Sequence, residues 1–181
     1  MMQGTAAFEE DTGFKIERSL RFNAGDSPRL TRTPSSAGDT TCWTFSAWVK
    51  LASFSSYDAV LSAGTVPTWD LAINSGVIQF GGNQTYRATN RKLRDPSAWY
   101  HVIWAFDSDH AIADSRMRIF VNGQEETSFA TNATISSGMT TDINANAIEQ
   151  NLGRTTSENG YYFNGLISNV HFIDGLQLSP A

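Results

Sequence analysis

The segment Trp43-Thr44-Phe45-Ser46-Ala47-Trp48-Val49-Lys50 decides the fold class. Its odd-numbered positions are all apolar, and a second tryptophan lies among the even-numbered ones. Apolar side chains at every second residue indicate a β-strand, because successive side chains of a strand point to opposite faces of its sheet. Since this strand carries apolar groups on both faces, we expect it near the centre of a sheet.

Similar short runs flank this segment on both sides. They lie at residues 58–63, 69–74, 77–81, 86–89, 99–107, 117–122, 148–153 and 162–173. Turn-forming residues separate them, and Asn122-Gly123 is the strongest hairpin dipeptide in the chain. No window keeps apolar residues at helical spacing over three turns. The pattern therefore predicts an all-β protein, a two-sheet antiparallel β-sandwich.

Less regular segments lead to more local predictions. Residues 20–22 and 29–32 flank a turn, so we expect a hairpin at the start of the domain. Residues 127–146 predict a long surface loop with one weak strand, and the alternation of apolar residues changes phase near Ser168, which predicts a β-bulge there. Alternation and size predict a core that includes Leu20, Phe22, Phe45, Ile119, Val170, Phe172 and the tryptophans Trp43, Trp48, Trp99 and Trp104.

Composition excludes several classes of protein. The chain has 181 residues, enough for one domain, and a net charge of -5, which disfavours nucleic acid as a partner. Cys42 is the one cysteine, so no internal disulfide forms, and three scattered histidines predict no zinc site. Neither an export signal nor about 18 consecutive apolar residues occurs, so we expect no membrane partner.

The chain divides into residues 1–17, an N-terminal arm, and residues 18–181, the sandwich domain. The arm carries Phe8 and Phe14 around the acidic run Glu9-Glu10-Asp11. A few apolar groups cannot offset a backbone entropy cost of about 1–2 kcal/mol per ordered residue. We therefore expect the arm to become ordered against a partner subunit, with Phe8 and Phe14 as anchors.

Six sequence fragments, in this order, resemble the laminin-G-like, concanavalin A-like jelly roll. They are Ser19-Leu20-Arg21-Phe22-Asn23, the segment 43–50, Trp99-Tyr100-His101-Val102, Arg118-Ile119-Phe120-Val121-Asn122-Gly123, Asn151-Leu152-Gly153 and Phe163-Asn164-Gly165-Leu166-Ile167. The sequence Val-His-Phe-Ile-Asp-Gly at 170–175 is also similar to laminin-G-like modules in structural proteins of tailed bacteriophages, especially marine ones.

That resemblance implies a non-enzymatic virion subunit, either a tail fibre or a capsid decoration protein. It would be assembled in the host cytoplasm, bind other virion proteins and be oligomeric in the particle. The principal alternative is a carbohydrate-binding adhesin that contacts host-surface glycans. A glycoside hydrolase is the least favoured alternative, since the Glu-x-Asp-x-x-Glu strand of the glucanase relatives is missing.

The residues that other catalytic mechanisms need are also missing from the sequence. Glu125 and Glu126 are adjacent and so face opposite ways, and Cys42 has no nearby base for nucleophilic catalysis. We therefore expect no enzymatic activity.

Binding residues can be suggested for three kinds of partner. Exposed aromatic rings can stack on sugars, and the candidates are Trp69, Tyr86, Tyr161 and Tyr162; the alternative is that each packs on a neighbouring strand or subunit. Calcium is the candidate cofactor, held by Asp26 and Asp174 if the jelly roll brings its ends together, although Asn169 stands where many relatives carry an acid. Arg87, Arg91 and Arg94 form a basic cluster that is either a solvated loop or a docking surface for a protein partner.

Overall fold

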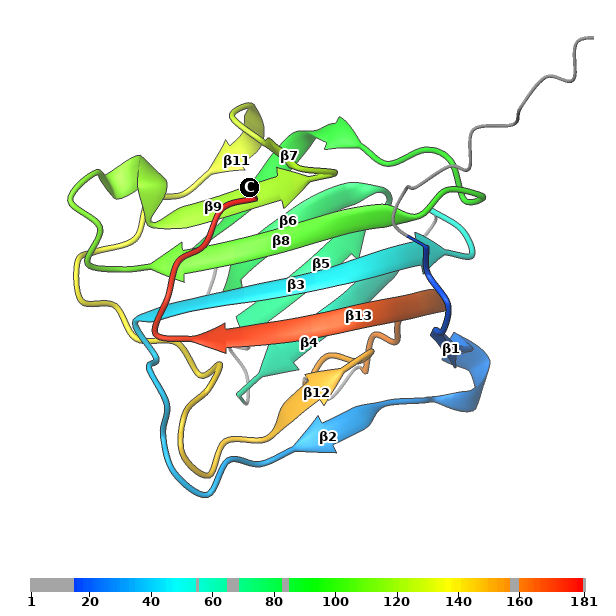
Figure 1. The fold of residues 1–181 in the computed structure, drawn as a ribbon, viewed down its shortest axis with the longest axis horizontal. Helices are drawn as coiled ribbons and strands as arrows, with labels where there is room; N and C mark the ends of the chain where they lie inside the picture. The colour runs from blue at the N-terminus through cyan, green and yellow to red at the C-terminus, as the bar shows by residue number, and fades with distance from the viewer. Residues whose placement is uncertain (1–14, 55, 65–68, 83–84, 157–159, 181) are drawn as a thin grey trace, which may run out of the picture.

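Two antiparallel sheets face each other in the computed structural model, which describes residues 15–180 apart from 55, 65–68, 83–84 and 157–159 (Figure 1). The first sheet has the order β1 (Leu20–Phe22), β13 (Gly165–Asp174), β3 (Cys42–Leu51), β8 (Tyr100–Asp107), β9 (Met117–Val121), β10 (Gln124–Glu125). The second has the order β11 (Phe129–Asn132), β7 (Thr85–Lys92), β6 (Val77–Gly82), β5 (Trp69–Asn74), β4 (Tyr57–Ala63), β12 (Gln150–Leu152), β2 (Leu30–Arg32). The predicted all-β sandwich is confirmed.

The helices are limited, among these residues, to two single 3₁₀ turns, η1 (Ala24–Asp26) and η2 (Ala113–Ser115). Neither has the length or hydropathy of a membrane-spanning helix.

Strand β3 lies inside the first sheet, as its sequence predicts. It pairs along most of its length with β8 on one side and with β13, the last strand, on the other. The Asn122-Gly123 turn joins β9 to β10, and both residues have the positive φ values, 49° and 80°, that a tight hairpin turn needs. The bulge is confirmed as well: the β13–β3 register shifts between Ser168 and His171, where Asn169 has φ 46°.

The expected hairpin at residues 20–32 is wrong. Strand β1 pairs with β13 in the first sheet, whereas β2 pairs with β12 in the second. The intervening residues include η1 and the left-handed Ser27, and they carry the chain from one sheet to the other. Two strands of three residues gain little from pairing with each other, and each instead extends a larger sheet.

The core lies between the sheets and is built around aromatic rings. Trp43 is fully buried, with its ring centroid 5.4 Å from Phe106 and 5.6 Å from Phe80 of the opposite sheet. Its Nε1 donates to Thr141 Oγ1 at 3.1 Å, and Trp104 Nε1 donates to the Gln79 carbonyl across the sandwich at 2.9 Å. Phe22, Phe45 and Ile119 are buried as predicted.

Several expected core residues are not buried. Trp48 lies on the outer face of the first sheet, stacked on His101 at 5.1 Å, and Trp99 precedes β8; both are half-buried. Leu20, Val170 and Phe172 are exposed. The reason is that alternation identifies the face on which a side chain lies, and an opposing layer must also cover that face.

The loop expected at 127–146 contains one strand, β11, and packs more deeply than a surface loop. Ile135 and Ile143 are buried in the core cluster. The loop therefore closes one end of the sandwich.

Replacing Trp43 by alanine should lower the free energy of unfolding by about 3–5 kcal/mol, because it leaves a large cavity between the sheets. Urea denaturation followed by circular dichroism measures this change. The exposed Ile112 provides the control, and Ile112→Ala should change stability by less than about 0.5 kcal/mol. Equal effects of the two variants would contradict the described core.

Candidate functional site

After β12 the chain doubles back over the edge of the second sheet. The Gly153 amide donates to the Val60 carbonyl, the Thr155 amide to the Tyr161 carbonyl, and the Phe163 amide to the Gly153 carbonyl, each at 2.9 Å. We call residues 153–163, of which 157–159 are not described, the flap. The hydrogen bonds make it a short antiparallel pair next to β4.

The two sides of the flap differ in character. Phe163 is fully buried and packs edge-to-face on Phe22, with centroids 6.0 Å apart. Arg154 and Tyr162 pair across the flap, and the Arg154 guanidinium lies 5.4 Å from the Tyr162 ring centroid. The flap is thus anchored in the core by an aromatic ring and carries a cation–π pair.

Tyr161 presents an exposed aromatic ring. Half of its surface is accessible (50%), and its ring centroid lies 5.1 Å from that of Tyr57. The Tyr57 hydroxyl in turn donates to Asp70 Oδ2 at 3.2 Å. Burial and the negative charge of Asp70 raise the pKa of Tyr57, so its hydroxyl keeps its proton. The exposed ring is therefore held by a half-buried ring whose hydroxyl is hydrogen-bonded to Asp70.

Several buried polar atoms beside Tyr161 lack hydrogen-bond partners among the described residues. They are Asn151 Oδ1, Arg154 Nε and Thr156 Oγ1. The Asn151 amide nitrogen is satisfied, because it donates to Glu149 Oε1 at 3.0 Å. A buried donor or acceptor left unpaired costs about 1–3 kcal/mol, so atoms of this kind indicate a bound ligand or water.

A hollow of about 370 Å³ lies at Thr156, near the start of the flap. It is lined by Gly64, Ala147, Ile148, Glu149 and Thr156. Gly64 has φ +90°, and a Cβ there would collide with the Asp142 carboxylate, so glycine is required. Glu149 and Thr156 are thus the polar residues that line the hollow. We call Glu149, Asn151, Arg154, Thr156, Tyr161 and Tyr162 the flap site.

The structure separates the four aromatic candidates. Tyr161 and Tyr162 belong to the flap site, and Tyr86 is exposed on β7, opposite Gly81. Trp69 is a correction: it is buried in the core at the start of β5, edge-to-face with Phe106 at 5.6 Å.

The polar members of the flap site escaped sequence reasoning. They lie in a hydrophilic stretch whose sequence is typical of a loop: Glu149, Asn151, Arg154 and Thr156. The cost of burying their side chains depends on the fold of the flap, which the sequence pattern does not reveal.

The calcium candidates do not meet. Asp26 follows β1, whose Phe22 pairs with Gly165, while Asp174 ends the ten-residue strand β13 opposite Trp43. At about 3.3 Å per residue, the two ends of β13 are about 30 Å apart. Asp174 instead accepts hydrogen bonds from the Asp39 amide and from Asn144 Nδ2, both at 2.8 Å. Among the described residues no group of three His, Cys, Asp or Glu is placed to hold a metal ion.

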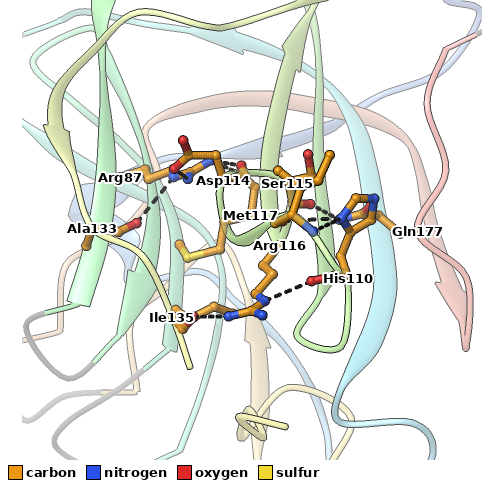
Figure 2. Close-up of polar contacts among 10 residues, drawn as sticks. Arg87, His110, Asp114, Ser115, Arg116, Met117, Ala133, Ile135 and Gln177 are labelled. Atoms are coloured by element: carbon orange, nitrogen blue, oxygen red, sulfur yellow. Dashed lines mark hydrogen bonds and ion pairs between the residues drawn. The ribbon is translucent and has the colours of Figure 1, made fainter. Parts of the chain in front are cut away.

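Arg87 is a further correction, because it is buried (Figure 2). Its guanidinium donates to the carbonyls of Met117, Asp114 (2.7 Å) and Ala133 (3.3 Å), and pairs with the Asp114 carboxylate at 3.2 Å. Figure 2 shows Arg116 beside it, joining the carbonyls of His110 and Ile135. Arg87 therefore fastens β7 to η2 and cannot contact a partner.

The other two arginines of that cluster are accessible. Arg91 makes an ion pair with Glu126 at 2.7 Å, and Arg94 is exposed.

The two-sheet sandwich has the fold of the concanavalin A-like lectins. Residues 23–181 match the family Laminin_G_3 of the concanavalin A-like lectin/glucanases superfamily, and the chain belongs to this family. No curated protein sequence matches it.

Solved structures with the same fold include three of particular interest. Domain 4 of the extracellular arabinanase AbnA from Geobacillus stearothermophilus, in complex with arabinotriose, has a TM-score of 0.60 at 16% identity, covering 97% of this chain and 78% of that one. The CBM40 of the IT-sialidase from Ruminococcus gnavus has a TM-score of 0.57 at 15% identity, covering 83% and 94%. The enzymatically active domain of tailspike protein 2 from bacteriophage CBA120 has a TM-score of 0.58 at 12% identity, covering 89% of this chain and 25% of that one.

Replacing Arg87 by methionine should destabilise the fold by about 3–5 kcal/mol, because three buried carbonyl groups lose their charged hydrogen-bond donor and are left without a partner. Arg91→Met on the same strand should cost less, about 1 kcal/mol, since the Arg91 side chain is 43% exposed and water can replace it beside Glu126. Chemical denaturation of both variants measures the difference. Similar losses would show that Arg87 is not the structural arginine of β7.

Asp58 should make stability depend on pH. It is buried at the start of β4, where its Oδ1 accepts from the Asn164 amide that follows the flap at 2.9 Å, and burial raises its pKa to about 6. The unfolded pKa is about 3.9, so between these values the folded state binds more protons than the unfolded one. Its contribution therefore favours folding below pH 4 and is lost as the pH rises to about 6.

The variant Asp58→Asn tests this, because the amide oxygen can still accept from Asn164 but does not titrate. Melting temperatures between pH 4 and 7 should differ between wild type and variant in slope, with the wild type losing stability relative to Asp58→Asn as pH rises. Parallel curves would contradict the raised pKa. The comparison cancels the opposite contribution of His101, whose pKa burial lowers.

Proposed function

We propose that this chain is a non-catalytic carbohydrate-binding module and that a glycan binds at the flap site. The observation that carries the proposal is the exposed Tyr161 ring, fixed by Tyr57, next to three buried polar atoms without partners among the described residues. Carbohydrates match this combination, because a sugar has an apolar face that stacks on an aromatic ring and hydroxyls that both donate and accept hydrogen bonds.

Each residue has a defined part in the proposed complex. The Tyr161 ring stacks on one sugar, and the partly exposed Arg154, Thr156 and Tyr162 of the same flap are the polar side chains for its hydroxyls, whereas Asn151 is fully buried and supports them. Glu149 lines the hollow and orients Asn151 through their hydrogen bond. The relatives named above include modules of carbohydrate-active enzymes, one of them in complex with arabinotriose, which supports this choice of ligand class.

The absence of catalysis is part of the proposal. Glycoside hydrolysis needs two carboxyl groups flanking one bond, about 5–10 Å apart. Glu149 is the carboxylate that lines the hollow among the described residues. We therefore expect no release of reducing sugar from polysaccharides that the protein binds, and reproducible release by pure protein would overturn this part.

We further propose that the module serves in a phage particle, bound to other virion proteins. The resemblance of its sequence to modules of phage structural proteins supports this role, as does the tailspike domain among proteins of the same fold. Immunogold labelling of intact particles tests the proposal. Absence of the chain from purified particles would remove it without affecting the glycan site.

A glycan array first identifies the ligand, and calorimetry with that glycan then tests the site. Tyr161→Ala should weaken binding at least about tenfold, corresponding to about 1.4 kcal/mol. Thr156→Val, which removes one hydroxyl with little change in shape, should also weaken it.

Tyr86→Ala is the control, because it removes another exposed tyrosine, on β7 and outside the flap site, and should leave affinity within about twofold. If Tyr86→Ala lost glycan affinity and Tyr161→Ala kept it, the ligand would instead lie over β6 and β7. Absence of binding to every glycan would overturn the proposal.

A further inference from the structure

The sandwich is open along one edge. Strand β1 pairs with β13 at Gly165–Ile167 alone, so the half of β13 from Val170 to Asp174 has no strand on that side among the described residues. The facing edge of the second sheet is β2, which is three residues long. An unpaired strand edge offers free backbone N–H and C=O groups to another chain.

Apolar side chains point into this opening and remain exposed. The exposed fractions are 52% for Leu20, 51% for Leu30, 40% for Val170 and 36% for Phe172. Leu20 pairs with Ile167, Leu30 with Leu152 and Phe172 with Phe45, which all contact the core, so these side chains face inward between the sheets. Inward-facing residues that stay accessible lack a covering layer.

Two hollows follow this edge, with volumes of about 190 Å³ and 910 Å³. They share Leu30, Leu152 and Val170 and so form one groove. We call it the edge groove. Its larger part is bordered by residues 17–20, at the start of the described chain.

The rim of the edge groove carries more positive than negative charge. Arg18 and Arg32 line it together with Glu17, and Arg21 and Arg29 lie on the adjoining strand and turn. All four arginines are exposed, and none makes an ion pair within the described part of the chain. A matching occupant would carry apolar side chains and acids together.

The first fourteen residues of the chain have this chemistry. They contain Phe8 and Phe14 on either side of Glu9-Glu10-Asp11. Fully extended, fourteen residues span about 46–50 Å, whereas the five free residues of β13 need about 17 Å. The segment is long enough to leave one copy of the domain and reach the edge of another.

The chain's own path leaves the edge free. Residues 15–19 contact β13 at Ser168, whose Oγ donates to the Arg18 carbonyl, but they form no strand pairing with β13 beyond β1. This favours a second copy as the source of the occupant.

We propose that the edge groove binds residues 1–14 of a second copy of this chain. The segment adds a strand beside Val170–Asp174, places an aromatic ring between Leu30 and Val170, and sets its acidic run against the arginine rim. This is β-strand addition with side-chain specificity. The proposal is independent of the glycan site, which lies over the flap.

Full-length variants test it by sedimentation equilibrium. Wild type should self-associate. The double variant Phe8→Asp/Phe14→Asp and the single variant Val170→Asp should each weaken association at least tenfold. Leu178→Asp is the control, since Leu178 is comparably exposed but lies on the C-terminal segment away from the groove. It should associate like wild type.

Mixing gives the decisive result. The arm variant keeps an intact groove and the Val170→Asp variant keeps an intact arm, so together they should form a one-to-one complex although each alone is monomeric. Circular dichroism and melting temperature confirm that each variant is folded. A monomeric wild type, equal association of Val170→Asp and wild type, or failure of the mixture to form a complex would overturn the proposal. Glycan binding by the monomeric variants is expected to persist, which separates this test from that of the flap site.

Discussion

The buried indole of Trp43 ties the layers of this protein together. It contacts Phe106 within its own sheet and Phe80 in the other, and its N–H requires a hydrogen-bond acceptor that cannot be water. Thr141 supplies this acceptor from the long segment after β11. Consequently a stretch rich in Ser, Thr and Asn folds over the end of the sandwich and buries Ile135 and Ile143. Packing of the sheets and closure of the loop therefore both depend on the Trp43 side chain.

Both proposed binding surfaces arise where the chain changes sheets. The flap joins β12 of the second sheet to β13 of the first, and η1 joins β1 of the first to β2 of the second. These crossings occur at the same edge, where β12 and β2 face β13 and β1. A crossing segment cannot pair continuously with either sheet. It therefore leaves polar atoms unsatisfied at the flap and apolar side chains uncovered at the edge groove.

Sequence reasoning and structure agree for strands such as β3 and β5, which have a paired strand on each side. Segment 43–50 and strand β5 were placed almost residue for residue, because their alternation reflects burial in the sandwich. They disagree at Trp69, whose place at the end of a strand suggested an exposed ring that stacks on a sugar, and at Arg87, whose charge suggested an exposed surface. In both cases the side chain is buried by segments distant in sequence, Phe106 for Trp69 and residues 114–133 for Arg87.

The sequence by itself determined the all-β class, the strand positions, the bulge near Ser168 and the inward direction of Leu20, Val170 and Phe172, because these follow from local backbone preference and from alternation with a period of two. The tertiary structure alone decided which inward residues are covered, which arginine is buried and which polar atoms are left without partners. Those properties depend on whether a distant strand or loop lies opposite a side chain. Alternation along one strand carries no information about its neighbour in space, so coverage is settled when the two sheets pack.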